Sequence, residues 1–138
     1  MSRREAVRTV VRLSRLFERA SGELSLPHYR VLAAVAEGDE RASLVAKRLA
    51  LGKPAISASV DALCRRGLLI RQPTVGDQRV SPLRLTPAGQ AALHEAETAM
   101  LARLDAVLAH TDDAPGALAA LNRLGAGLDA LVAERRRG

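Results

Sequence analysis

The chain has 138 residues, 48% of them hydrophobic, and its 21 Lys and Arg against 15 Asp and Glu give a net charge of +6. This length and composition fit one folded domain with a real core. No apolar run is long enough for a signal peptide or a membrane span, so we expect a cytosolic protein. The single cysteine, Cys64, rules out an internal disulfide and suits a reducing compartment.

The opening segment, about residues 1–22, has the pattern of a helix with one apolar side. Val7, Val10, Val11, Ser14 and Phe17 recur along it at mostly three-residue steps. Ala, Leu and Arg are abundant, and strand-forming residues are scarce outside residues 68–85. We therefore predict a mostly α fold with a small β wing.

Two short helices with a tight joint are expected next. The first covers Ala42 to Ala50 and carries Leu44, Val45 and Leu49. The second restarts at Lys53, with Gly52 as its N-cap and Pro54 in the first turn, where a missing N–H costs nothing.

The second helix has two different faces. Ile56, Val60 and Leu63 follow the i, i+4, i+7 rule and are expected to face the core. The opposite face is small and polar near its start, which lets a helix approach base edges in a DNA major groove. Arg65 and Arg66 at its end can reach a phosphate strand, and Gly67 ends the helix. The outer face consists of Pro54, Ser57, Ala58, Asp61 and Arg65.

A hairpin is expected after these helices, because the apolar runs 68–71 and 83–85 flank a polar connection. Gly76 and Asp77 supply the backbone freedom of a tight turn. Arg79 is then expected near the tip, where a guanidinium suits a narrow minor groove and Asp77 can hold it in position. The alternative is a surface salt bridge on an ordinary hairpin.

The charge is concentrated in the same stretch. Between Arg41 and Leu85 nine Lys or Arg stand against two acids, a net charge of +7, whereas the remainder has twelve bases and thirteen acids. We call residues 41–85 the basic segment. It favours nucleic acid over an anionic membrane, because no long basic amphipathic stripe with Trp or Phe is present. Single strands are gripped by stacking on aromatic rings, and one Phe, one Tyr and no Trp favour duplex DNA instead.

Two long terminal helices are expected after the hairpin. Thr86 can cap a helix that starts at Pro87 and runs to about His110, and a break at residues 111–116 separates it from a second helix. Leu118, Leu121, Leu124, Leu128 and Leu131 line that second helix at mostly three- and four-residue steps. A small domain cannot cover so much apolar surface, so we expect a homodimer. The alternative is a helical bundle folded back within one chain.

Enzyme functions find little support in the sequence. His28, His94 and His110 show no short metal-ligand spacing, and no Gly-rich phosphate loop is present. We expect no metal, no cofactor and no enzymatic activity. Cys64 is interpreted as a small packing residue, with redox sensing beside Arg65 and Arg66 as the alternative.

Taken together, these segments resemble the MarR-type transcriptional regulators. The resemblance covers nearly the whole chain, and its most specific part is the Asp77-x-Arg79 wing ending in Leu85-Thr86-x-x-Gly89. It implies one MarR-like domain, with a winged helix-turn-helix at about 25–86 and dimerisation helices at about 1–22 and 87–136. It also implies a homodimer that binds a near-palindromic operator, usually as a repressor relieved by a small ligand or an oxidant.

The resemblance also implies site residues. Arg79 would enter the minor groove with Asp77 orienting it, and Lys53, Ser57 and their neighbours would contact the major groove and its phosphates. The family often has Ser or Thr where Gly52 and Ala55 stand, and a long polar residue where Ala58 stands, which weakens base-specific readout here. The full DNA-binding set is Arg41, Lys47, Lys53, Pro54, Ala55, Ser57, Ala58, Arg65, Arg66, Asp77 and Arg79.

A ligand in relatives often occupies the crevice between the dimer helices and the winged helix. Here the candidates are Arg12, Arg15, His28 and Tyr29, of which either arginine can meet a carboxylate. Two other functions remain open. One is a winged helix that binds proteins, for which a neutral face would be expected, and the other is an architectural protein that binds DNA without sequence preference.

Overall fold

The computed structural model describes residues 2–38, 41–72 and 82–137. Over these residues it contains six helices and one two-stranded antiparallel sheet. The expected mostly helical chain with a small β element is confirmed. The elements are α1 (Arg3–Ala20), α2 (Leu26–Ala36), α3 (Ala42–Leu49), α4 (Lys53–Arg65), β1 (Leu69–Arg71), β2 (Leu83–Leu85), α5 (Pro87–Leu108) and α6 (Ala114–Arg137).

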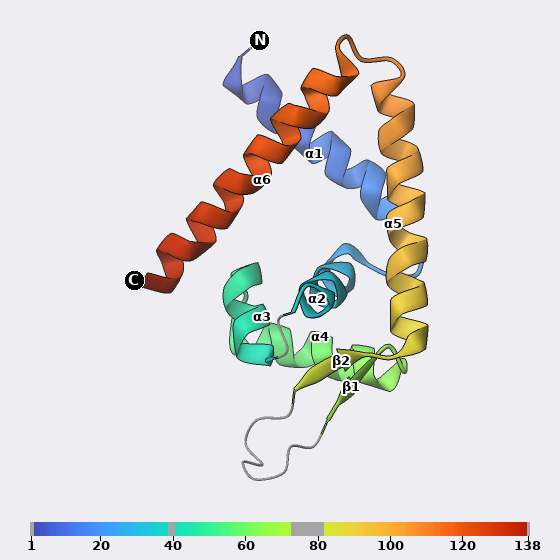
Figure 1. The fold of residues 1–138 in the computed structure, drawn as a ribbon, viewed down its shortest axis with the longest axis vertical. Helices are drawn as coiled ribbons and strands as arrows, with labels where there is room; N and C mark the ends of the chain where they lie inside the picture. Colours follow the sequence, from blue (N-terminus) through green and yellow to red (C-terminus); the bar gives the residue numbers. More distant parts are fainter. Residues whose placement is uncertain (1, 39–40, 73–81, 138) are drawn as a thin grey trace.

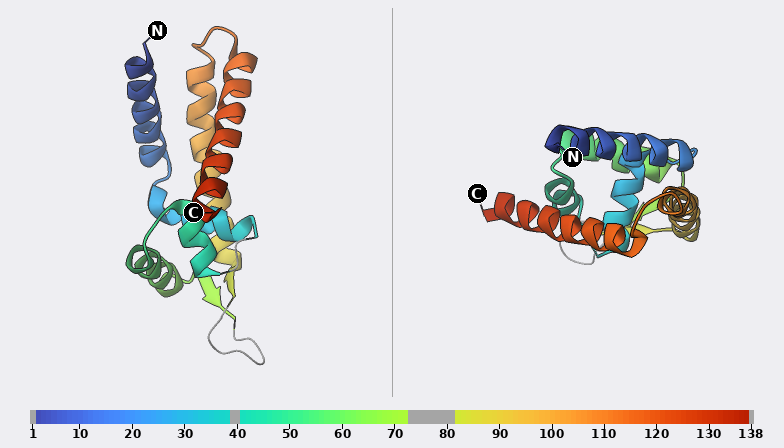
Figure 2. Two further views of the ribbon diagram at one scale, coloured as in Figure 1. Left: turned by 90° about the vertical axis from the view of Figure 1, so that its left-hand side faces the viewer. Right: turned by 90° about the horizontal axis from the view of Figure 1, so that it is seen from above.

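Two regions can be distinguished in Figure 1. Helices α2, α3 and α4 and the sheet gather at one end, and we call this region, residues 25–86, the head. Helices α1, α5 and α6 extend away from it, and we call them the arm (Figure 2). From the far end of α5 the chain turns back, and the C-terminal end of α6 comes to lie against α3.

The hydrophobic core lies mainly in the head. Helix α4 contributes Ile56, Val60 and Leu63, which are at most 2% exposed, as their spacing predicted. Leu44 on α3 stays 38% exposed, and Ala46 is buried beside Val45 instead. The buried residues are Leu24, Val31, Leu32, Ala34, Val35, Val45, Ala46, Ile56, Val60, Leu63, Leu68, Leu69, Leu83, Ala96 and Met100.

The predicted boundaries of α4 are confirmed. Gly52 is the N-cap with extended backbone angles, and Pro54 lies in the first turn. Gly67 has a φ of +73°, the left-handed conformation that favours glycine and ends a helix. Between α3 and α4, Ala50 also takes a left-handed conformation, which makes the joint tight.

The two strands pair in the expected antiparallel way. Leu69 lies opposite Leu85, Ile70 opposite Arg84 and Arg71 opposite Leu83. Leu69 and Leu83 are buried, so one face of the sheet closes the core of the head. The predicted turn at Gly76 and Asp77 lies outside the described residues.

The joint between sheet and arm explains the Leu-Thr-x-x-Gly pattern. The Thr86 hydroxyl donates to the carbonyl of Gly67 at 2.6 Å and accepts from the backbone N–H of Gly89 at 3.0 Å. A side chain at position 89 would overlap the carbonyl oxygen of Leu68. Thr86 therefore caps α5, while Gly89 lets that helix approach the strand closely.

The arm leaves much apolar surface uncovered. Val7, Val10 and Val11 on α1 are 63%, 58% and 56% exposed, and Leu124 and Leu128 on α6 are 61% and 63% exposed. Helix α5 ends at Leu108, close to the predicted position. None of the helices in the described part of the chain has the length and apolarity to cross a membrane.

Helix α6 begins earlier than the sequence pattern indicated. It starts at Ala114, inside the segment 111–116 that we expected to be a break. The Asp113 carboxylate accepts from the backbone N–H of Gly116 at 3.1 Å, so it caps the helix. Pro115 fits because the first turn needs no donated N–H from it.

Candidate nucleic-acid interface

The outward face of α4 is open to solvent. Pro54, Ala55, Ser57 and Ala58 are all exposed, while the opposite face of the same helix packs into the core. These side chains are short, so the helix backbone can come close to a ligand surface. Such a face suits insertion between the two walls of a DNA groove.

The N-termini of α3 and α4 differ from those of the other helices. Ser2, Ser25, Thr86 and Asp113 each accept a capping hydrogen bond at the starts of α1, α2, α5 and α6. Arg41 and Gly52, the N-caps of α3 and α4, make no such bond. Free backbone N–H groups and the positive end of the helix dipole form a natural site for phosphate.

Five cations of the basic segment extend into solvent on α3, on α4 and at the ends of these helices. Arg48 instead pairs with Glu37 beside α3, and Arg71 pairs with Asp61 at 2.9 Å, tying strand β1 to α4. The guanidinium of Arg84 donates to Gln72 at 2.7 Å. The exposed cations are Arg41, Lys47, Lys53, Arg65 and Arg66.

The structure does not test the predicted wing tip. Asp77 and Arg79 lie outside the described residues, so their proposed orientation in a minor groove stays a prediction. The base of the wing is described, and the pair Arg71 and Asp61 anchors it to the exposed helix.

The four candidate ligand residues fall into two groups. Arg12 and Arg15 on α1 line a cavity of about 570 Å³ against α5, whereas His28 and Tyr29 on α2 do not line it. Two lining arginines were not predicted from the sequence. They are Arg19, at helical spacing from Arg12 and Arg15, and Arg103 across the cavity. The lining residues are Thr9, Val11, Arg12, Leu13, Arg15, Leu16, Arg19, Arg103 and Val107.

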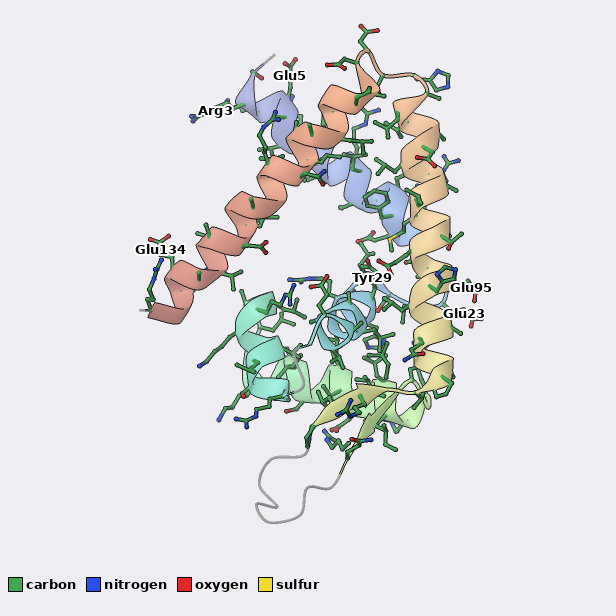
Figure 3. The ribbon with its side chains drawn as sticks, in the orientation of Figure 1. Arg3, Glu5, Glu23, Tyr29, Glu95 and Glu134 are labelled. Carbon is green, nitrogen blue, oxygen red and sulfur yellow. The ribbon has the colours of Figure 1, made fainter. Side chains whose placement is uncertain are left out.

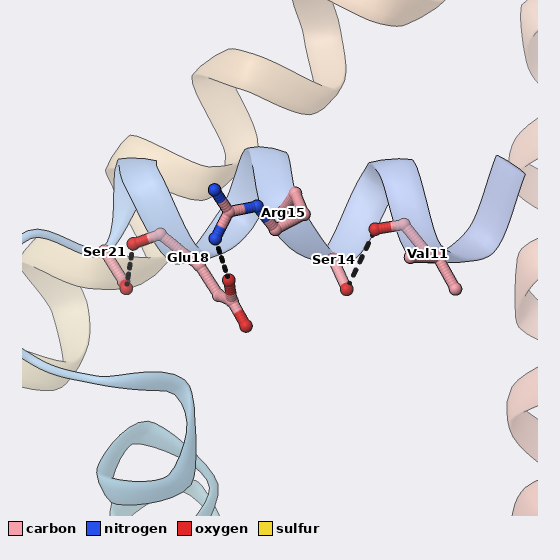
Figure 4. Close-up of polar contacts among 5 residues, drawn as sticks. All are labelled: Val11, Ser14, Arg15, Glu18 and Ser21. Atoms are coloured by element: carbon pink, nitrogen blue, oxygen red, sulfur yellow. Dashed lines mark hydrogen bonds and ion pairs between the residues drawn. The ribbon is translucent and has the colours of Figure 1, made fainter. Parts of the chain in front are cut away.

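Polar contacts on α1 involve only part of this arginine group. The Arg15 guanidinium lies 3.3 Å from Glu18 one turn away, and the pair is exposed to solvent (Figure 4). Ser14 and Ser21 donate to backbone carbonyls of the same helix. An exposed pair of this kind contributes little to stability, so Arg15 can exchange Glu18 for another anion.

His28 and Tyr29 belong to the junction between head and arm. The Tyr29 hydroxyl donates to Glu97 of α5 at 3.0 Å, and Figure 3 labels Tyr29 beside the arm. Burial and this hydrogen bond raise the pKa of Tyr29 to about 12. Burial, and secondarily the charge of Arg66, lower the pKa of His28 below 6.5. Tyr29 therefore keeps its proton at neutral pH.

Neither Cys64 nor any acidic cluster of the described residues forms a site of its own. Cys64 is half-buried on α4 and packs against the core of the head, which fits its interpretation as a packing residue. Within the described ranges, no three His, Cys, Asp or Glu side chains lie close enough together to hold a metal ion.

Comparison with known proteins relates part of the chain to one protein family. The MarR family model matches residues 23–80, which include α2, α3, α4 and strand β1. Over these residues the chain is similar to the MarR family. Members of this family are DNA-binding transcription regulators and not enzymes. Among curated protein sequences none matches the chain.

Solved MarR-type structures extend the likeness to the arm. The transcriptional repressor CouR, bound to a 23-mer DNA duplex, is 25% identical, with 88% of each chain covered and a TM-score of 0.77. The PcaV regulator from Streptomyces coelicolor, in complex with its natural ligand, is 28% identical, with 87% and 88% covered and a TM-score of 0.66. MarR from E. coli in its apo form is 17% identical, with 91% and 94% covered and a TM-score of 0.73. At 17% identity this last likeness shows the fold alone.

Proposed function

We propose that this protein is a MarR-type regulator, that it binds a specific double-stranded DNA operator as a homodimeric repressor, and that a small ligand releases it. The observation that carries the proposal is the outer surface of the head. Two uncapped helix N-termini and a face of short side chains lie there among exposed cations. Phosphate contacts would position the head, and α4 would enter the major groove. The proposed contacts are Arg41, Lys47, Lys53, Pro54, Ala55, Ser57, Ala58, Arg65 and Arg66, with Asp77 and Arg79 of the wing.

We propose that the winged helix-turn-helix, about residues 25–86, binds DNA. The helices at about residues 1–22 and 87–136 would form the dimer interface. Support comes from the aliphatic side chains that α1 and α6 expose in the single chain, with Val7 and Leu128 each 63% exposed. Apolar surface of this extent marks a protein contact. A two-fold dimer would place two heads on half-sites about one helical turn apart on DNA.

The proposed effector is an anion with an apolar body. The cavity between α1 and α5 joins the guanidinium groups of Arg12, Arg15, Arg19 and Arg103 to the apolar side chains around them. A carboxylate or phosphate would pair with the guanidinium groups, and the remainder of the molecule would lie on the aliphatic wall. The similar regulator PcaV forms a complex with a natural ligand, and the similar repressor CouR binds a DNA duplex, which supports both parts of the proposal. A regulator of this kind works beside its DNA, in agreement with the expected cytosolic location.

A binding comparison tests the proposed specificity. Fluorescence anisotropy would measure the affinity for a duplex taken from upstream of the protein's own gene and for a scrambled duplex of the same composition. We expect at least about a 1,000-fold preference for the upstream duplex, the lower range for specific DNA-binding proteins. No binding to either duplex would contradict the proposal and favour a protein-interaction module.

One specific observation also favours a second function, DNA binding without sequence preference. The exposed half of α4 presents Pro54, Ala55 and Ala58, which have no side-chain groups to hydrogen-bond with base edges. An architectural protein that binds DNA without sequence preference would have the same surface. Equal affinity for the upstream and scrambled duplexes would favour that function.

A further inference from the structure

A cavity of about 560 Å³ lies where the head meets the last turns of α6. Its walls come from three elements that are far apart in the sequence. Helix α3 forms one side, the joint and the start of α4 form another, and α6 closes it. The lining residues are Ser43, Ala46, Lys47, Ala50, Leu51, Lys53 and Arg135.

All three charged residues of this cavity are cations. Lys47 comes from α3, Lys53 is the first residue of α4, and Arg135 comes from the last turns of α6. No acid of the described chain lines the cavity, and the Glu37 carboxylate pairs with Arg48 of α3. Like charges gathered around one space repel each other, so the arrangement is stabilised when an anion enters.

The position of α6 makes this gathering possible. Helix α6 packs against α3, and its C-terminal end lies beside the head in Figure 1. The chain thus brings a basic helix end to a surface that is already basic. Burial of the apolar side chains of α6 does not explain this position, because Leu124 and Leu128 earlier on the helix remain exposed. An arginine and two lysines around one cavity match the chemistry of a phosphate group.

We propose that this cavity binds a phosphate of the DNA backbone, with Arg135 of the arm acting together with Lys47 and Lys53 of the head. This inference rests on the proposed function. DNA is favoured over a free phosphate compound because Lys53, which lines the cavity, is the first residue of α4, the helix whose outer face is proposed to enter the major groove and whose N-terminus has no side-chain cap. Arg135 then couples the position of α6 to the affinity for DNA, because any movement of α6 changes a phosphate contact.

The test compares Arg135→Gln with Arg123→Gln. Both residues are exposed on α6 and both changes remove one positive charge, but Arg123 does not line the cavity. The salt dependence of binding to a mixed-sequence duplex would be measured by anisotropy. We expect the log–log slope of the Arg135→Gln dimer to be shallower by about 2, since each lost phosphate contact removes about 0.9. The Arg123→Gln slope should equal that of the wild type, and Arg135→Lys should restore it.

The outcomes separate this inference from the function on which it rests. A steep wild-type slope that Arg135→Gln leaves unchanged would overturn the inference alone. A flat wild-type slope would overturn the proposed function and the inference with it. An NMR titration of the DNA-free protein with inorganic phosphate adds a third outcome. Shifts at Lys53 that Arg135→Gln abolishes, together with an unchanged slope, would assign the cavity to a free phosphate compound instead of DNA.

Discussion

The head and the arm leave different chemical groups exposed to solvent. The head closes its hydrophobic core but leaves the N-termini of α3 and α4 without capping side chains. The arm caps the starts of α1, α5 and α6 but leaves aliphatic side chains in solvent. Unsatisfied N–H groups with nearby cations attract phosphate, whereas exposed aliphatic rows attract another apolar surface. The difference indicates that each region is completed by its own kind of partner.

A charged substitution in the proposed dimer interface of the arm should have the largest effect, a loss of dimerisation. Leu128→Glu would place a carboxylate at each of two symmetry-related positions in the proposed interface. Losing a buried Leu costs about 1.5–3 kcal/mol at each position, so dimerisation should weaken at least about 100-fold. Sedimentation analysis would measure this against Asn122→Glu, which adds the same charge elsewhere on α6. An unchanged dimer in Leu128→Glu would exclude this face from the interface.

Disturbing the joint between the two regions should come next. Gly89→Ala forces a methyl group into the carbonyl of Leu68 and should lower the free energy of unfolding by about 1–3 kcal/mol. Gly125→Ala is the matched control, because a side chain there meets open space and removes a flexible helical glycine. The control should gain about 0.5–1 kcal/mol. Equal thermal stability of the two variants would contradict the close packing of α5 on the strand.

A capping side chain at the N-terminus of α4 should lower the affinity for DNA and raise the stability of the fold. Gly52 has ordinary extended backbone angles, so a side chain fits there without strain. Gly52→Asp should raise the stability by a few tenths of a kcal/mol and lower the affinity for DNA about tenfold, since its carboxylate occupies the proposed phosphate position. Gly52→Ser, which caps without charge, should lose much less affinity. If Gly52→Asp binds DNA as tightly as the wild type, this helix end does not hold a phosphate.

The smallest effect concerns pH and the junction between head and arm. The pKa of His28 is lowered by burial and by Arg66, so the folded state binds protons less readily than the unfolded state. The contribution of neutral His28 is therefore complete above pH 6.5 and is lost as the pH falls below that value. Thermal melting of the wild type between about pH 7.5 and 5.5 should show a larger loss than His28→Gln. The same loss in both proteins would contradict this prediction.

The sequence predicted the elements that local rules control. Gly52, Pro54 and Gly67 marked the ends of α4, and the spacing of Ile56, Val60 and Leu63 identified its buried face, because caps and periodicity act over one helix. The early start of α6 was missed because Asp113 and Pro115, read as a break, also suit the N-cap and the first turn of a helix. Arg103 and Arg135 could not be predicted as site residues, since tertiary packing alone brings them to α1 and α3.

The most direct test of a phosphate-binding head joined to a second head by the arm is the salt dependence of DNA binding for the wild type and for Leu128→Glu. If each head neutralises about four phosphates and the arm joins two heads, the log–log slope should be about −7 for the wild type. The Leu128→Glu monomer should give about half that slope, because one head binds alone. A wild-type slope near zero would contradict the phosphate-binding head. Equal steep slopes for the two proteins would contradict the role of the arm in joining two heads on one duplex.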